Sequence, residues 1–188
     1  MLALALPALV QTAPARAQAV DEPVVGPSDL MFWLPDLPAV VERGGNALLV
    51  TGYAWHNPSS YGHNNGLNAW SWGGGYSRWF DHADGRSDML FAMGFSDSNR
   101  NFQFAGGVGH FWQVARVETT SVSLGYAAGF TARQDIWNGA PFPFLLPVLD
   151  LRLLDRLDIY FTYIPPLPTD QLNGNKGNVA FMFLGLRF

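Results

Sequence analysis

LFAMGFSDSNRNFQFAGGVG, residues 90–109, contains two runs of apolar and small residues separated by a polar break. The first run ends at Phe95 and the second begins at Phe102. Asp, Ser and Asn are frequent in turns because their side chains hydrogen-bond to nearby backbone groups. The pattern therefore predicts a β-hairpin whose tip carries Asp97 and Ser98. Most such tips are solvated turns, so the meaning of this one depends on the rest of the chain.

A period-two alternation extends on both sides of this hairpin, from Asn46 to the C-terminus. It predicts eight strands, each long enough to cross a membrane when tilted, over residues 46–56, 69–80, 88–96, 102–115, 119–133, 143–153, 156–165 and 178–188. Long connections alternate with short turns along the chain. Because successive connections of an up-and-down barrel lie at opposite rims, the long ones share one rim. A soluble lipocalin-type barrel has the same strand count without needing this alternation.

The composition also favours a membrane barrel. Charged residues are 14% of the 188-residue chain, well below the roughly 25% of an ordinary soluble domain. The sequence has no apolar run long enough for a membrane-spanning helix. A net charge of −4 without a basic cluster argues against nucleic-acid binding. The absence of cysteine excludes disulfides and thiol chemistry. We predict an all-β fold, an eight-stranded antiparallel up-and-down membrane β-barrel over residues 46–188.

The N-terminal part precedes the barrel. Residues 1–19 are apolar and end in Ala-Gln-Ala, which is typical of the end of a secretory signal peptide; a disordered tail is the alternative. Residues 20–45 form a leader in which Ser28 and Asp29 are candidates to cap an amphipathic helix starting at Leu30. Pro35 and Pro38 make this helix short or broken. Such an element either lies in a membrane interface or is an irregular leader.

Side-chain size predicts which face of each strand points inward. In strand 119–133 the large residues Leu124, Tyr126 and Phe130 alternate with small ones, so the large face should meet lipid. The last strand is apolar on both faces until Arg187. Small inward residues leave a cavity, and the inward glycines Gly107, Gly109 and Gly129 are candidate lining positions. Alternatively, these glycines only let tilted strands bend.

Polar residues collect at the long-loop rim. His56 ends the first strand, and Asp97 and Ser98 end the third; odd-numbered strands run the same way, so these residues share the rim. A neutral imidazole can take a proton from a hydroxyl, and a carboxylate can orient or polarise the partners. The alternative is an exposed loop histidine beside an ordinary turn. Arg133 faces inward near the same rim, where it could contact a lipid phosphate or pair with Asp97.

The sequence gives weaker evidence for a metal site, and for a gap in the barrel wall through which lipid enters, than for the rim residues. The remaining histidines have no partner at metal-ligand spacing, so we expect neither a metal site nor another cofactor. Pro147 and Pro165 remove ladder donors. Each either loosens strand pairing and admits lipid sideways or simply ends a strand.

Several short motifs match one family together, although each alone is unspecific. They are Trp55-His56, Trp72-Gly-Gly-Gly75 with Ser77-Arg-Trp79, Phe91-Ala-Met93 through Ser98, Thr131-Ala-Arg133, Leu145-Leu-Pro147, Thr162-Tyr-Ile-Pro165 and Gly177-Asn-Val179 through Phe188. From about residue 46 to its end, the chain resembles the lipid A palmitoyltransferases, the PagP family of outer-membrane acyltransferases.

The resemblance implies an enzyme of the Gram-negative outer membrane. Such a protein moves a palmitoyl chain from the sn-1 position of a glycerophospholipid to a hydroxyacyl chain of lipid A, with His56, Asp97 and Ser98 as functional residues. The donor chain would lie in the apolar interior above a floor at Gly109, and we expect a monomer without nucleic-acid partners.

Strand geometry fits such a donor chain. The strand from Phe102 to Gly109 spans about 17 Å of depth after a tilt of ~40°, on the order of an extended chain of fourteen to sixteen carbons. Two other functions stay open: a phospholipase-like esterase with water as acceptor, and a non-enzymatic lipid-binding or structural barrel.

Overall fold

The computed structural model describes residues 32–61, 66–166 and 177–188. The expected signal peptide at residues 1–19 lies outside this part of the chain, as do the expected helix cap at Ser28 and Asp29 and the histidine at position 63.

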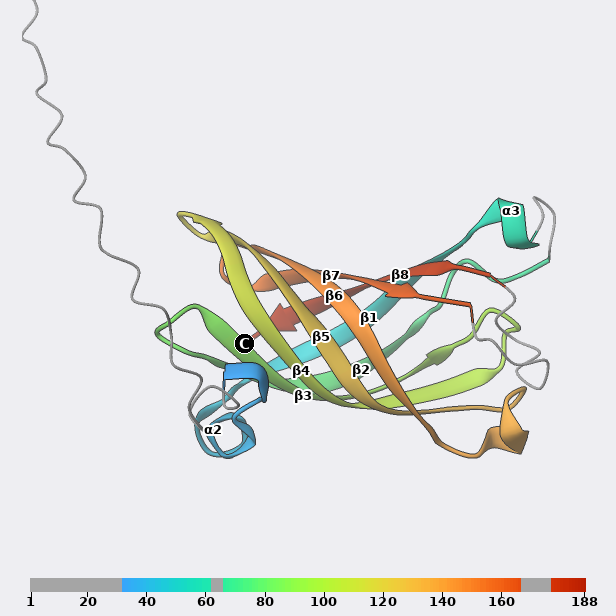
Figure 1. The fold of residues 1–188 in the computed structure, drawn as a ribbon, viewed down its shortest axis with the longest axis horizontal. Helices are drawn as coiled ribbons and strands as arrows, with labels where there is room; N and C mark the ends of the chain where they lie inside the picture. Colours follow the sequence, from blue (N-terminus) through green and yellow to red (C-terminus); the bar gives the residue numbers. More distant parts are fainter. Residues whose placement is uncertain (1–31, 62–65, 167–176) are drawn as a thin grey trace, which may run out of the picture.

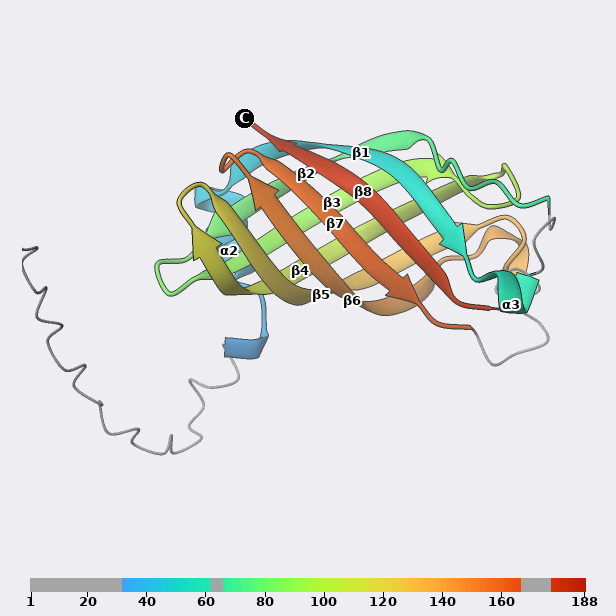
Figure 2. The same cartoon turned by 90° about the horizontal axis from the view of Figure 1, so that it is seen from above.

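The eight strands form a closed barrel in which each strand pairs antiparallel with its sequence neighbours and β1 pairs with β8. Figures 1 and 2 show the strands tilted around the barrel axis. The strands are β1 (Gly45–His56), β2 (Gly73–Asp81), β3 (Arg86–Ser96), β4 (Phe102–Val117), β5 (Thr120–Arg133), β6 (Phe142–Leu153), β7 (Leu157–Ile164) and β8 (Val179–Arg187). This confirms the predicted fold class.

The long connections lie at one rim of the barrel and the short turns at the other, as the sequence indicated. The connections after β1, β3, β5 and β7 reach the long-loop rim, which carries α3 (Pro58–Tyr61) and the 3-10 turn η1 (Trp137–Gly139). The other connections are short turns at the opposite rim. The predicted strand boundaries agree with the observed ones to within two residues except at β2, which begins at Gly73 rather than at residue 69. Asn68 accepts from the Trp70 N–H and donates to the Trp70 carbonyl, so its side chain replaces ladder bonds just before the strand.

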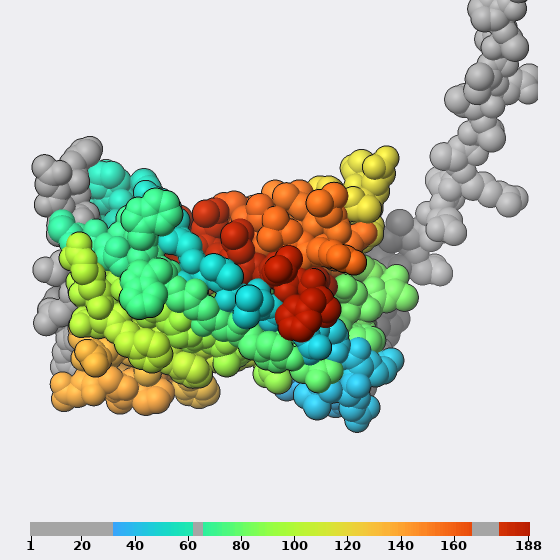
Figure 3. All heavy atoms as spheres, turned by 180° about the vertical axis from the view of Figure 1, so that it is seen from behind, coloured from blue at the N-terminus to red at the C-terminus, as the bar shows by residue number. Residues whose placement is uncertain are grey.

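The barrel wall is apolar on its outer face. Large exposed side chains lie on the outward positions of every strand, for example Leu48, Tyr76, Leu124, Phe161 and Leu186. Figure 3 shows one side of this wall as a continuous surface over the strands. A band of outward apolar residues is the surface that a barrel presents to lipid. Within the described ranges, no helix is long and apolar enough to cross a membrane.

The predicted helix start at Leu30 lies outside the described residues; within them, the helix α2 spans Leu37–Arg43. A turn at Phe32 and Trp33 is broken before Pro35. Asp36 then caps α2 by accepting the Ala39 N–H, and Pro38 lies in the first turn, where a helix needs no amide donor. The helix packs on the outside of β2 and β3 near the short-turn rim, with Ala39 and Val40 buried.

A buried carboxylate on the outer wall attaches this N-terminal segment. Asp88 of β3 points outward yet is fully buried, and it accepts hydrogen bonds from the Asp36 N–H and from the rings of His82 and His110. Nε2 of His110 in turn lies 2.9 Å from the carbonyl oxygen of Phe32. A charge on a lipid-facing wall is costly unless it is satisfied by hydrogen bonds. The segment 32–36 therefore covers a polar site that the strand pattern alone did not reveal.

Asp88→Asn should release this segment. Loss of a hydrogen bond to a charged group costs about 1.5–3 kcal/mol, so we expect segment 32–43 to open about 10- to 100-fold more often. Limited proteolysis of the folded barrel in detergent would measure this as faster cleavage within the segment. Asp84→Asn, in the exposed turn that precedes β3, is the matched control. Equal cleavage rates for both variants would contradict the anchoring role of Asp88.

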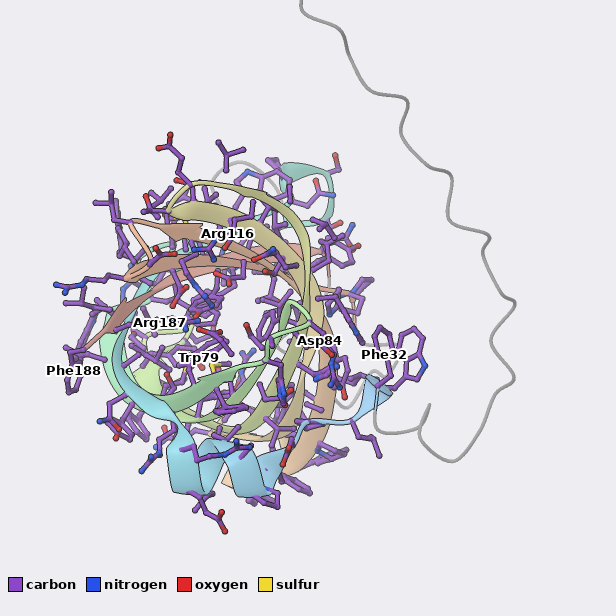
Figure 4. The ribbon with its side chains drawn as sticks, turned by 90° about the vertical axis from the view of Figure 1, so that its left-hand side faces the viewer. Phe32, Trp79, Asp84, Arg116, Arg187 and Phe188 are labelled. Atoms are coloured by element: carbon purple, nitrogen blue, oxygen red, sulfur yellow. The ribbon has the colours of Figure 1, made fainter. Side chains whose placement is uncertain are left out.

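The barrel interior near the short turns is filled. Trp79, Phe111 and Tyr160 pack together there, with Trp79 stacked on Tyr160 at a centroid distance of 5.7 Å. Below them Asp158 accepts from Arg152 at 2.8 Å and from Arg187 at 2.6 Å. Figure 4 looks in from this end and shows Arg187 and Trp79 inside the wall and Phe32 outside it. Any ligand chain must therefore occupy the other half.

A candidate acyl-transfer site at the mouth of an apolar cavity

The half of the barrel near the long loops encloses a cavity of about 410 Å³. Its deeper wall is apolar and aromatic and includes Met89, Phe91, Met93, Phe144, Phe181 and Phe183. Polar side chains line it near the rim, where Asp97, Ser98, Gln103, Thr131 and Arg133 contribute. The cavity therefore matches a molecule with a long apolar chain and a polar head.

His56 points inward at the long-loop rim, toward the cavity-lining Ser98, because β1 contains a β-bulge. Ala47, Leu49 and Thr51 are the buried positions of β1, but after the register shift between Thr51 and Tyr53 the buried position becomes Ala54. The extra residue reverses the alternation, so that His56, at an even position, points inward. Sequence reasoning placed His56 at the correct rim but did not assign its face; Gly52, a glycine inside an alternating strand, was the available signal for the bulge.

The structure brings together two of the three residues expected to act in catalysis. Nε2 of His56 lies 2.7 Å from Oγ of Ser98, which is hydrogen-bonding distance. The ring of Tyr61 packs edge-on against the imidazole at a centroid distance of 5.4 Å. With a neutral imidazole the hydroxyl donates to Nε2, which is the arrangement that general-base catalysis requires.

Asp97 lies next to Ser98, but its carboxylate hydrogen-bonds to the backbone of the turn and not to the imidazole of His56. It is 2% exposed, and its Oδ1 accepts from the backbone N–H groups of Asn99 and Asn101, both at 2.8 Å. Its Oδ2 has no hydrogen-bond partner among the described residues and lies 3.7 Å from Nε of Arg133. Within the described residues Asp97 makes no hydrogen bond to His56, so the three side chains do not form a serine-protease-type triad.

Asp135 is a rim residue that sequence reasoning missed. It binds Arg133 through two hydrogen bonds of 3.0 and 2.8 Å and accepts another from the side-chain amide of Asn99. The pair therefore links the loop after β5 to the tip that carries Asp97. An Asp two residues after an inward Arg was the available sequence signal. Arg133 itself contacts Asp97 only loosely, and its predicted role in binding a substrate phosphate stays a prediction.

The inward glycines divide into two kinds. A Cβ atom on Gly107 or Gly129 would lie 2.1 Å from a carbonyl oxygen of the facing strand, so glycine there permits the close approach of β4 and β5. A Cβ atom on Gly109 would instead meet side chains, at 2.7 Å from Phe111 Cε2 and 3.0 Å from Met89 Cε. Met89 and Phe111 both line the cavity. Substrate contact at all three glycines stays a prediction, with Gly109 the one placed against the cavity floor.

Gly109→Met should shorten the acyl chain that the protein prefers by a few carbons. The new side chain has to displace Met89 and Phe111 into the cavity, because both are buried at the end of the slot. Transfer from phospholipids with acyl chains of graded length would measure the preference by mass spectrometry. Gly106→Met is the control, because a side chain at this position of the same strand points to the outer wall beside Phe104. An unchanged preference in Gly109→Met would contradict the floor assignment.

Backbone pairing is incomplete beside the cavity. β6 pairs with β7 only up to Val148 and Thr162, although β6 continues to Phe142 along β5. Pro147 lies at this limit, and its carbonyl accepts the hydroxyl of Thr162 at 2.8 Å. Pro165 follows the end of β7. The β1–β2 ladder is interrupted after Val50 and Gly74, but the segment before β2 pairs again with β1 through the bridge between Tyr53 and Trp70. The wall between β6 and β7 therefore lacks a continuous ladder level with the cavity.

No cluster that could hold a metal ion occurs among the described residues. The described residues of the site offer a base, a hydroxyl, a buried carboxylate and an apolar slot. This set can bind an acyl ester and move a proton between two hydroxyl oxygens.

Comparison with known proteins identifies the family. Residues 36–185 match the family described as "Antimicrobial peptide resistance and lipid A acylation protein PagP". The chain is 35% identical over 175 residues to "Lipid A acyltransferase PagP" of Bordetella parapertussis, covering 90% of this chain and 89% of that protein. It is 37% identical over 146 residues to the Bordetella pertussis protein of the same name, covering 75% of each. A Legionella longbeachae protein of that name is 30% identical over 160 residues, covering 79% of this chain and 68% of its own. The chain belongs to the PagP family.

Proposed function

We propose that this protein is an outer-membrane lipid A acyltransferase that takes a palmitoyl chain from the sn-1 position of a glycerophospholipid and esterifies a hydroxyacyl chain of lipid A. Membership of a lipid A acylation family and the closed, outwardly apolar barrel support the enzyme class and its location. The observation that carries the site is the His56–Ser98 hydrogen bond at the mouth of an apolar cavity.

The proposed roles of the residues differ with their depth in the cavity. The apolar slot holds the donor's acyl chain, so that its ester group lies near the rim. There His56 accepts the proton of the attacking hydroxyl, a new carbon–oxygen bond forms to the carbonyl, and the ester bond to glycerol breaks. The same proton then passes to the departing glycerol oxygen. Ser98 holds the imidazole in place or relays that proton, and Asp97 keeps the tip in shape.

The lipid substrates have a direct route from the membrane. Level with the cavity, the missing ladder bonds between β6 and β7 leave a place where the wall opens toward lipid without breaking a hydrogen-bonded pair. An acyl chain entering there would leave the bilayer without crossing water. The cavity lies within one barrel, so the reaction needs a single copy of the chain, and we propose a monomer.

The test is transfer by the purified barrel in detergent, with phospholipid labelled in its sn-1 chain and lipid A as acceptor. We expect lipid A that carries one additional labelled chain, together with a lysophospholipid. Release of free fatty acid in place of acylated lipid A would favour the esterase alternative. No turnover with any lipid would favour a binding or structural barrel. Mass spectrometry of lipid A from cells with and without the protein gives the same comparison in the membrane.

A further inference from the structure

Gln103 lies where the lining of the cavity changes from polar to apolar. It is the first inward residue of β4 to line the cavity, and the next one down the strand is Ala105. An acyl ester has its carbonyl at the same kind of boundary, between a polar head and a hydrocarbon chain. The position of the side chain therefore corresponds to the expected position of the reacting group.

The amide of Gln103 is held in one orientation. Its Nε2 donates to Oγ1 of Thr131 at 2.9 Å, and Thr131 donates its own proton to the carbonyl of Phe104 at 2.8 Å. Because the threonine proton is already used, Thr131 can only accept from Gln103, which fixes the nitrogen on that side. The amide nitrogen carries two protons. Within the described part of the chain, its second N–H has no hydrogen-bond partner.

The neighbours of Gln103 place it close to the acid–base pair. It is the register partner of Phe95 on one side and of Arg133 on the other. Asp97 lies two residues beyond Phe95, so it is a diagonal neighbour, and such Cβ atoms are roughly 7–8 Å apart in a sheet. Ser98 follows at once and lines the same cavity. Asp135 binds two of the five N–H groups of Arg133, and Gln103 adds a neutral donor on the same wall.

We propose that the free N–H of Gln103 donates a hydrogen bond to the carbonyl oxygen of the donor's ester and to the oxyanion that develops on it. Thr131 acts as the positioning residue for this amide. The inference rests on the proposed acyl transfer and adds the group that stabilises its transition state. Stabilisation of a developing oxyanion by a fixed donor is a large contribution to acyl transfer.

The step balances without any further reactant. The acceptor hydroxyl oxygen attacks the ester carbon, its proton moves to His56, and the carbonyl oxygen becomes an oxyanion that Gln103 hydrogen-bonds. When the oxyanion collapses, the bond to glycerol breaks and the proton on His56 passes to the glycerol oxygen. Gln103 stays neutral and is unchanged at the end.

Gln103→Met and Gln103→Glu both remove the donor, one with an apolar and one with an acidic replacement. We expect kcat to fall about tenfold or more in both, with KM for phospholipid little changed, since a lost oxyanion donor costs about 10²–10³ in a fully dry site. Gln113→Met, on the exposed far end of the same strand, is the matched control. A loss in Gln103→Glu alone would show a charge effect and overturn the proposal.

Two lipid analogues distinguish transition-state stabilisation from packing. A phosphonate analogue of the donor mimics the tetrahedral oxyanion, whereas an ether analogue has no carbonyl. Gln103→Met should weaken inhibition by the phosphonate by the same factor as kcat/KM and leave ether-lipid binding unchanged. Equal weakening of both would overturn the proposal. Absence of transfer by the wild-type protein would overturn the proposed function as well, whereas normal transfer by Gln103→Met would overturn only the role of Gln103.

Discussion

His56→Ala should lower acyl transfer to lipid A by about 10²–10⁴-fold, which is the usual contribution of a positioned general base. The imidazole is hydrogen-bonded to Ser98 at 2.7 Å and lies at the mouth of the slot, where the attacking hydroxyl has to lose its proton. Initial rates with labelled phospholipid measure the effect. Ser59→Ala, on α3 three residues further along the chain, is the control for changes at the rim.

The double variant His56→Ala with Ser98→Ala makes this test sharper. If the two side chains act as one unit, removing both should cost no more than removing His56 alone, because residues that act together are not additive. If the rate loss of the double variant equals the product of the two single losses, His56 and Ser98 act independently. Transfer at the normal rate by His56→Ala in a correctly folded barrel would remove the catalytic assignment.

The barrel could be predicted from the sequence because its strands are two-sided. Each strand needs one face for lipid and one for the interior. Large apolar and small residues therefore alternate in segments such as 119–133. The loop lengths then predict which strand ends share a rim, and this places His56 and Ser98 at the same rim. These features depend on local pattern and strand count alone.

The remaining features depend on tertiary context. The bulge at Gly52 turns His56 inward; a glycine inside a strand indicates a bulge but does not determine the register that follows it. The segment before α2 is attached to the outer wall because Asp88 accepts a hydrogen bond from the Asp36 N–H. Gly107 and Gly129 stay predicted lining positions, and their missing side chains also permit the close approach of β4 and β5. Only the packed backbone distinguishes a glycine that leaves space from one that lets two strands approach.

The filled end of the barrel determines where the slot stops. Aromatic rings close the slot near the middle of the barrel, and a network of carboxylates and guanidinium groups occupies the space below them. Asp158 is the centre of that network: it is fully buried and accepts from Arg152 and Arg187. Two buried cations thus depend on one carboxylate, with the half-exposed Asp81 as a second partner of each.

Asp158→Asn should therefore lower the free energy of unfolding by about 3–5 kcal/mol, the range expected when one partner of a buried ion pair is removed. Both guanidinium groups would remain inside the barrel facing a neutral amide. Chemical unfolding in detergent micelles, followed by tryptophan fluorescence, measures the loss. Lower stability of this end should also broaden the preference for acyl-chain length, because the aromatic floor rests on the network.

The same substitution at two nearby aspartates provides the controls. Asp155 forms an exposed pair with Arg116 at 2.8 Å, and surface pairs contribute about 0–1 kcal/mol, so Asp155→Asn should change stability little. Asparagine also tolerates the positive φ of 54° at that position. Asp150 is buried, but its Oδ1 has no partner among the described residues and its Oδ2 lies 4.0 Å from Arg152. Asp150→Asn should therefore cost far less than Asp158→Asn. Equal losses at positions 150 and 158 would mean that burial alone, rather than the two hydrogen-bonded arginines, determines the stability of this end of the barrel.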